Sequence, residues 1–199
     1  MNNDFQQTVV LIGGPNGAGK TTVAPGLLGS YINLDTFVNA DVLAQGLSGM
    51  RPETEALAAG RLMISHLHQL ADEGKSFAFE TTLASRTFAP WLKGLTRRGY
   101  AFHLVYLWID DVTIAINRVS ARVRAGGHDV PVETIRRRYQ SGLRNFFRLY
   151  KPMATTWQKY DCSRASVPML IATGGLTEEE NIIDGKRWSK LKGSIHEKG

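Results

Sequence analysis

The chain has 199 residues, a length that suits one domain with a sizeable core, and its formal net charge of +6 favours anionic partners. Hydrophobic residues make up 43% of it, as in an ordinary globular protein, but no apolar run is long enough to cross a bilayer. The polar first seven residues predict no secretory signal, and the single cysteine, Cys162, excludes an internal disulfide and fits a reducing compartment. We therefore expect a cytoplasmic protein that is not bound to a membrane.

Short apolar, β-rich runs alternate along the chain with segments whose apolar residues recur at helical spacing. The runs predict five strands, at residues 8–12, 36–39, 76–79, 102–109 and 167–172. Most of them are almost continuously apolar, as expected for strands covered on both faces. The helical patterns cover residues 52–71, 111–124 and 131–150. This alternation predicts βαβ units, a parallel sheet and right-handed crossovers.

No internal repeat or linker is visible, so we expect one domain over residues 1–199. Within it we expect the last residues, 189–199, to be frayed. In sheets of this kind a ligand binds beyond the carboxyl ends of the strands, so chemistry is expected at those positions.

A glycine-rich loop directly follows the first predicted strand and opens a helix. The pattern G-x-x-x-x-G-K-[ST] matches over Gly14, Pro15, Asn16, Gly17, Ala18, Gly19, Lys20 and Thr21, with Thr22 next. Glycines let the backbone turn tightly and point its N–H groups inward, and the helix N-terminus adds positive partial charge. We expect this loop to cradle nucleotide phosphates, with Lys20 at the β- and γ-phosphates and the Thr21 hydroxyl as a Mg²⁺ ligand. The alternative, a glycine-rich turn with a chance lysine, is disfavoured by the position between strand and helix.

Carboxylates follow the second, third and fourth predicted strands. Asp41 either caps a helix, or acts as the general base for an acceptor hydroxyl or as a Mg²⁺ ligand. Glu80, followed by Thr81, is either a surface carboxylate or part of a polar clamp on an acceptor substrate. Asp110 resembles a Walker B aspartate but fits a helix cap equally well. Two carboxylates at consecutive strand ends beside a phosphate loop favour a functional role for Asp41 and Glu80.

Much of the positive charge lies in two helical segments joined by a glycine hinge. The basic residues there are Arg118, Arg122, Arg124, Arg136, Arg137, Arg138, Arg144, Arg148 and Lys151. Such a cluster favours anions, whether nucleotide phosphates, a phosphorylated substrate or a nucleic-acid backbone, and a solvated helix face is the simplest alternative. Phosphoryl transfer spreads negative charge over the equatorial oxygens, so we interpret residues 118–138 as a lid whose arginines stabilise that charge.

Four ordered segments together resemble the zeta-toxin family of P-loop kinases. They are G-G-P-N-G-A-G-K-T-T, F-V-N-A-D, F-E-T-T-L and R-V-R-A-G-G-H-D-V-P-x-E-x-I-x-x-R-Y, and they fall between about residues 9 and 147. The resemblance implies an α/β fold of the three-layer P-loop kinase type. Its five-stranded, mostly parallel sheet would have helices on both faces and a small helical lid.

The resemblance also implies a role for each residue singled out above. Lys20 would hold the phosphates and Asp41 would deprotonate the acceptor hydroxyl, while Glu80 and Thr81 would contact the acceptor. The lid arginines that grip the transferring phosphate would be Arg122 or Arg124, together with Arg138.

Toxins of this family phosphorylate UDP-N-acetylglucosamine and are held in check by an antitoxin protein. The resemblance therefore implies a kinase that uses ATP and Mg²⁺ on a small-molecule hydroxyl, such as that of a nucleotide sugar, with an antitoxin as a possible partner. The chain is shorter than the characterised toxins, which leaves antibiotic or other metabolite phosphotransferases as an alternative. A P-loop hydrolase or switch without an acceptor is a further alternative. A nucleic-acid partner is disfavoured, because no basic platform interleaved with aromatic residues is visible.

Overall fold

The computed structural model describes residues 7–29, 34, 36–39, 52–164 and 167–196, so the predicted base Asp41 lies outside the described residues. The described residues form a seven-stranded sheet in the order β2-β3-β1-β4-β5-β6-β7. The strands are β1 (Thr8–Gly13), β2 (Thr36–Val38), β3 (Phe77–Thr81), β4 (Ala101–Trp108), β5 (Thr156–Asp161), β6 (Met169–Gly175) and β7 (Asn181–Ile182). Strands β1 to β5 pair in parallel, whereas β6 and β7 pair antiparallel.

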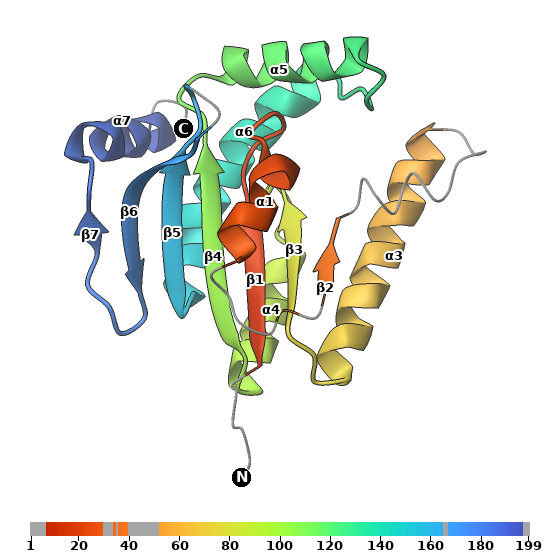
Figure 1. Cartoon of the computed structure of the whole chain (residues 1–199), viewed down its shortest axis with the longest axis vertical. Helices are drawn as coiled ribbons and strands as arrows, with labels where there is room; N and C mark the ends of the chain where they lie inside the picture. The colour runs from red at the N-terminus through yellow and green to blue at the C-terminus, as the bar shows by residue number, and fades with distance from the viewer. Residues whose placement is uncertain (1–6, 30–33, 35, 40–51, 165–166, 197–199) are drawn as a thin grey trace.

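Helices lie on both sides of the sheet and across its end. They are α1 (Lys20–Leu28), α3 (Pro52–Asp72), α4 (Phe88–Arg97), α5 (Val112–Arg124), α6 (Val132–Asn145) and α7 (Gly185–His196). In Figure 1, α1 lies in front of the sheet and α4 and α6 behind it, while α5 crosses beyond the carboxyl ends of the parallel strands. Within the part of the chain that the structure describes, none of the helices has the length and apolar character needed to span a membrane.

The central strands are covered on both faces, because successive side chains of a strand point to opposite sides. Val9 and Leu11 belong to an apolar cluster that includes residues of α3, α4 and α7. Val10 and Ile12 belong to a second cluster that includes residues of α1 and α5. All four side chains are completely buried. The layers of helix, sheet and helix confirm the predicted α/β fold of P-loop kinase type.

The sheet of the described residues has seven strands, so the predicted number of five is wrong. β5 was not predicted, because its buried positions alternate with half-buried ones and include the polar Lys159 and Asp161. The run at residues 167–172, predicted as a fifth strand, contributes to β6, which pairs antiparallel with β5. The short β7 then extends the sheet beyond β6.

The C-terminal segment is helical over residues that include most of the stretch 189–199, for which we expected fraying. Helix α7 runs from Gly185 to His196, and only residues 197–199 lie outside the described residues at this end. Trp188 and Leu191, one turn apart, are 3% and 0% exposed. The Trp188 ring stacks on Trp157 of β5, with ring centroids 5.9 Å apart. Burial of such side chains contributes roughly 1.5–3 kcal/mol each, which holds a polar segment with little helical preference of its own against the sheet.

The predicted lid, residues 118–138, comprises the end of α5, a turn and the start of α6. Asp111 caps α5 by accepting a hydrogen bond from the Thr113 N–H at 2.7 Å. At its other end α6 continues into a π-helix (Phe146–Tyr150) and a short 3₁₀ turn (Lys151–Met153). The predicted helix over residues 131–150 is therefore helical along nearly its whole length, but it widens where its aromatic residues pack on the sheet.

Candidate functional site

The phosphate loop connects β1 to α1 at the carboxyl end of the sheet (Figure 1). Gly17 and Gly19 have φ of 77° and 82°, in the left-handed region that strains other residues. A Cβ added at Gly17 would lie 2.9 Å from the carbonyl oxygen of Ala115, so the loop packs directly against α5. Glycine is therefore required at position 17 both by the turn and by the close approach of α5.

Lys20 is the first residue of α1, and its ammonium group bends back over the loop. Its Nζ donates to the carbonyl oxygens of Gly14 at 3.0 Å and Pro15 at 3.1 Å. The Ala18 N–H donates to the same Pro15 oxygen at 3.2 Å, so the loop closes a turn around it. Thr22, the third residue of α1, is exposed. A cation is thus held at a helix N-terminus, where the backbone dipole also favours an anion.

The Thr21 hydroxyl lies between two side chains that come from neighbouring strand ends. Thr21 Oγ1 is 3.0 and 3.1 Å from the two carboxylate oxygens of Glu80, to which it donates its single proton. The side-chain amide of Asn39, directly after β2, donates to the same hydroxyl at 3.3 Å. Glu80 and Asn39 are only 9% and 5% exposed. The structure therefore brings a buried acid and a buried amide together with a hydroxyl of an exposed residue beside the phosphate loop.

The strand order explains why Glu80 reaches the phosphate loop. β3 is the direct neighbour of β1, with Thr81 opposite Gly13 in the parallel register. The two strands end at the same level, so the Glu80 side chain meets the first turn of α1. Thr81, predicted with Glu80 as an acceptor contact, accepts a hydrogen bond from the Leu83 N–H at 3.3 Å in the turn that follows.

The same cluster offers the oxygen ligands that Mg²⁺ prefers. The Thr21 hydroxyl and the Glu80 carboxylate adjoin one another at the loop, so they fit a cation held between the loop and bound phosphates. Asn39 was not predicted as a site residue. Its only signal in the sequence is its place in F-V-N-A-D, two residues before Asp41.

Arg118, on α5, joins three parts of the molecule. Its guanidinium donates to the carbonyl oxygen of Gly17 in the phosphate loop at 3.3 Å. It also donates to the carbonyl oxygens of Cys162 at 2.8 Å and Ser163 at 3.2 Å, in the loop after β5. Arg118 therefore contacts the phosphate loop directly, which its place in a predicted lid did not indicate.

Burial, together with the nearby Asp161, raises the pKa of the Cys162 thiol to about 12, so this thiol is not a nucleophile at neutral pH.

The predicted lid arginines lie elsewhere on the α5–α6 hairpin. Arg122 donates to the carbonyl oxygen of His128 at 3.0 Å, and Arg124 donates to the Ser120 hydroxyl at 3.0 Å. These two contacts are formed within the hairpin itself. Arg138 is half-buried on α6.

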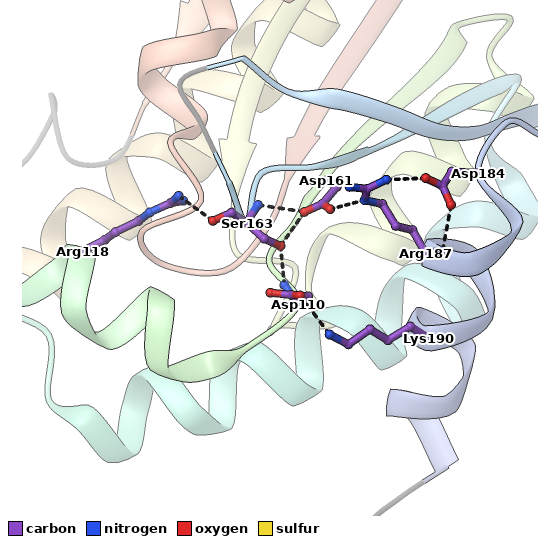
Figure 2. A network of polar contacts seen from close by, with 7 residues as sticks. All are labelled: Asp110, Arg118, Asp161, Ser163, Asp184, Arg187 and Lys190. Atoms are coloured by element: carbon purple, nitrogen blue, oxygen red, sulfur yellow. Dashed lines mark hydrogen bonds and ion pairs between the residues drawn. The ribbon is translucent and has the colours of Figure 1, made fainter.

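Asp110, the Walker B-like residue, contacts α7 rather than Thr21. It accepts a hydrogen bond from Lys190 at 2.9 Å, and its N–H donates to the Ser163 hydroxyl at 2.8 Å (Figure 2). Burial acts to raise the pKa of Asp110, but hydrogen bonds from Lys190 and Ser163 and the charges around it outweigh burial and lower the pKa. Because Asp111 caps α5, Asp110 does not fill that alternative role either.

Two comparisons of sequence bear on this geometry. A family model described as an AAA domain matches residues 9–148, which include the phosphate loop, the Glu80 strand end and the α5–α6 hairpin. An uncharacterised protein of Haemophilus influenzae is 28% identical over 138 residues, which cover 68% of this chain and 94% of that protein.

Solved structures share the fold at low sequence identity. The AvrRxo1-ORF1:-ORF2 structure with ATP has a TM-score of 0.72 at 14% identity, over 95% of this chain and 64% of that chain. A structure from the PezAT chromosomal toxin-antitoxin system of Streptococcus pneumoniae has a TM-score of 0.61 at 16% identity, over 96% of this chain and 85% of that chain. With a family match over more than half of its length and this fold, the chain belongs to the AAA domain family of P-loop proteins.

Proposed function

We propose that the protein is a kinase that uses ATP and Mg²⁺ to phosphorylate a hydroxyl group of a small molecule. The observation that carries this proposal is the contact between Thr21 and Glu80 beside the phosphate loop. It joins an expected metal ligand to a buried carboxylate at the end of the strand next to β1. The shared fold of the ATP-containing AvrRxo1 structure supports a nucleotide at this loop.

In the proposed reaction the acceptor oxygen attacks the γ-phosphorus of ATP. The bond between that phosphorus and the bridging oxygen breaks, so that ADP leaves, and the acceptor proton passes to the carboxylate of Asp41. Lys20 stabilises negative charge on the β- and γ-phosphates. The arginines that would approach the transferring group from the hairpin are Arg122 or Arg124, together with Arg138.

Bound Mg²⁺ neutralises charge between the β- and γ-phosphates in reactions of this kind. In this chain the Thr21 hydroxyl and the Glu80 carboxylate would hold the ion, directly or through water. The Asn39 amide donates to the Thr21 hydroxyl, and so it orients that oxygen.

For the acceptor we propose a nucleotide sugar, with UDP-N-acetylglucosamine to be tested first. Support comes from the four sequence segments that resemble zeta toxins and from the shared fold with the PezAT structure, whose name describes a toxin-antitoxin system. By the same reasoning we propose an antitoxin protein as a partner.

The kinase proposal is tested by mass spectrometry of small molecules after incubation with ATP and Mg²⁺. A panel of nucleotide sugars, antibiotics and a cell extract should yield one product that is heavier by a phosphate. We expect Asp41→Asn to lower the rate of its formation about a hundredfold or more, since general bases contribute on that order. Asp72→Asn, at an exposed position on α3, is the control and should act as the wild type does.

Two results would contradict these assignments separately. Full transfer activity in the Asp41 variant would remove the base assignment while leaving the kinase proposal intact. Steady ATP hydrolysis without any phosphorylated product would instead favour the hydrolase or switch.

Glu80→Gln distinguishes a metal-supporting role for Glu80 from an acceptor clamp. Glutamine can still accept a hydrogen bond from Thr21 but has no charge to offer a cation. We expect the Mg²⁺ concentration for half-maximal activity to rise about ten- to a hundredfold, with little change in the KM of the acceptor. Thr81→Val is the matched comparison and should alter only the acceptor KM. If the Glu80→Gln variant has an unchanged Mg²⁺ requirement and a raised acceptor KM, Glu80 binds the acceptor substrate rather than supporting the metal ion.

A further inference from the structure

A continuous series of polar contacts runs from α7 to Arg118 of α5 (Figure 2), and Arg118 in turn contacts the phosphate loop. It begins at Arg187 in the first turn of α7, whose Nε donates to the Asp161 carboxylate at 2.7 Å. Asp184 fixes this arginine, because its carboxylate accepts from the Arg187 guanidinium and, at 3.0 Å, from the Arg187 N–H. The Asp161 side chain is 7% exposed and the Arg187 side chain 31%, so the carboxylate of this pair is largely shielded from solvent.

Asp161, the last residue of β5, shapes the loop that follows. Its second carboxylate oxygen accepts hydrogen bonds from both the N–H, at 2.8 Å, and the hydroxyl of Ser163. The Ser163 hydroxyl in turn accepts from the Asp110 N–H at 2.8 Å, which ties this loop to the end of β4. One buried carboxylate therefore sets the backbone of the loop while it is itself held by α7.

The carbonyl groups of this loop are the partners of Arg118. The guanidinium donates to the oxygens of Cys162 and Ser163, at 2.8 and 3.2 Å, and to that of Gly17 in the phosphate loop. A guanidinium has several donors in a rigid plane, so moving two of its acceptors moves the third contact as well. Gly17 is closely packed on α5 and has little room to adjust independently.

We propose that Arg187 is a positioning residue for the nucleotide. It acts on the conformation of the phosphate loop through Asp161, through the loop after β5 that contains Ser163, and through Arg118. This inference rests on the nucleotide binding in the proposed function, but not on the transfer reaction. The second contact from α7 to the sheet, between Lys190 and Asp110, involves a lysine side chain that is 58% exposed and contributes little. The coupling therefore runs through the pair of Arg187 and Asp161, whose carboxylate is buried while the arginine side chain is 31% exposed.

The test is the affinity for a non-hydrolysable ATP analogue with Mg²⁺, measured by titration calorimetry at a temperature where every variant is folded. We expect Arg187→Met to raise the Kd about three- to tenfold, as residues that couple to a site through others do. Asp161→Asn should raise it similarly, because asparagine can keep the Ser163 contacts but loses the charged partner of Arg187. Arg187→Lys, which keeps the positive charge, should restore part of the affinity.

A double-mutant cycle separates positioning from a general loss of stability. In an Arg118→Met background, Arg187→Met should have no further effect on the Kd, since the contact through which it acts is gone. The control is Glu180→Gln, which removes the ion pairs of Glu180 with Lys151 and with Lys192 of α7 without touching Asp161. It should lower thermal stability but leave the Kd unchanged.

Three outcomes would overturn the inference. These are an unchanged Kd in Arg187→Met, an equal rise in Kd in Glu180→Gln, or the full effect of Arg187→Met in the Arg118→Met background. A wild-type protein that binds the analogue but yields no phosphorylated product would overturn the kinase proposal alone. A wild-type protein that does not bind the analogue would overturn both.

Discussion

Replacing Lys20 with methionine is expected to lower kcat/KM for phosphoryl transfer from ATP on the order of a thousandfold. The ammonium of Lys20 is a cation that the structure places over the phosphate loop, 3.0 and 3.1 Å from two loop carbonyl oxygens. A preorganised donor aimed at developing charge typically contributes a factor of about a hundred to a thousand, and Lys20 also carries a full charge. Methionine keeps the length of the side chain, so the change removes charge rather than packing.

Steady-state kinetics with ATP, combined with thermal melting, measures this effect and separates it from unfolding. Lys93→Met, on an exposed position of α4, matches the chemical change and should leave kcat/KM at the wild-type value. Wild-type kcat/KM in the Lys20 variant would show that this loop does not hold the phosphates of the donor.

The phosphate loop could be predicted from the sequence because all of its parts are contiguous. Strand, glycines, lysine and threonine lie within residues 8–21, and the conformation of Gly17 and Gly19 follows from local sterics. The buried strands around it could be predicted for a similar reason, since their apolar runs are almost unbroken.

The contact between Thr21 and Glu80 could only be predicted in part. The two residues are 59 positions apart, and the sequence placed Glu80 at a strand end near the ligand. It did not show that β3 is the strand directly beside β1, and this pairing decides that Glu80 meets Thr21. Tertiary pairing of strands is a long-range property that local periodicity does not contain.

The series of contacts that links α7 to Arg118 through Asp161 and the loop after β5 could not be predicted, because β5 was missed. A strand is recognised by apolar residues at its buried positions, yet two of the three buried positions of β5 are Lys159 and Asp161. Each is accommodated by distant parts of the chain, Asp161 by Arg187 of α7 and Lys159 by aromatic rings. A burial that depends on partners so far away in sequence has no local signal.

Lys159 is the costliest of these buried groups. It is 0% exposed, and among the described residues its Nζ has no hydrogen-bond acceptor. The nitrogen lies over the rings of Phe146, Tyr106 and Phe147, at 4.0, 4.4 and 4.6 Å from their centroids. Burial, followed by repulsion from Lys151, lowers the pKa of Lys159 well below its ordinary value of 10.5. Cation–π contacts contribute about 0.5–2 kcal/mol, whereas desolvating an ammonium ion costs several kcal/mol, so the desolvation term is the larger.

We therefore expect Lys159→Met to stabilise the protein at pH 7, by roughly 1–4 kcal/mol. Because the pKa is lowered in the folded state, the unfolded chain binds a proton that the folded chain does not, in the range between the folded pKa and 10.5. Wild-type stability must then fall as pH decreases through that range, and the variant should lose this slope. Denaturant unfolding of both proteins at several pH values from 7 to 10 measures both effects.

The sign of the change in the free energy of unfolding shows whether desolvation or the cation–π contacts dominate at Lys159. Lys93→Met, the exposed control, should change neither the free energy of unfolding nor its pH dependence. A Lys159→Met variant less stable than the wild type would mean that the three rings more than offset the loss of hydration. If the variant is more stable and its stability no longer depends on pH in this range, β5 carries the buried amine of Lys159 at a net cost in stability. The same strand ends in Asp161, which connects α7 to the loop whose carbonyl groups bind Arg118.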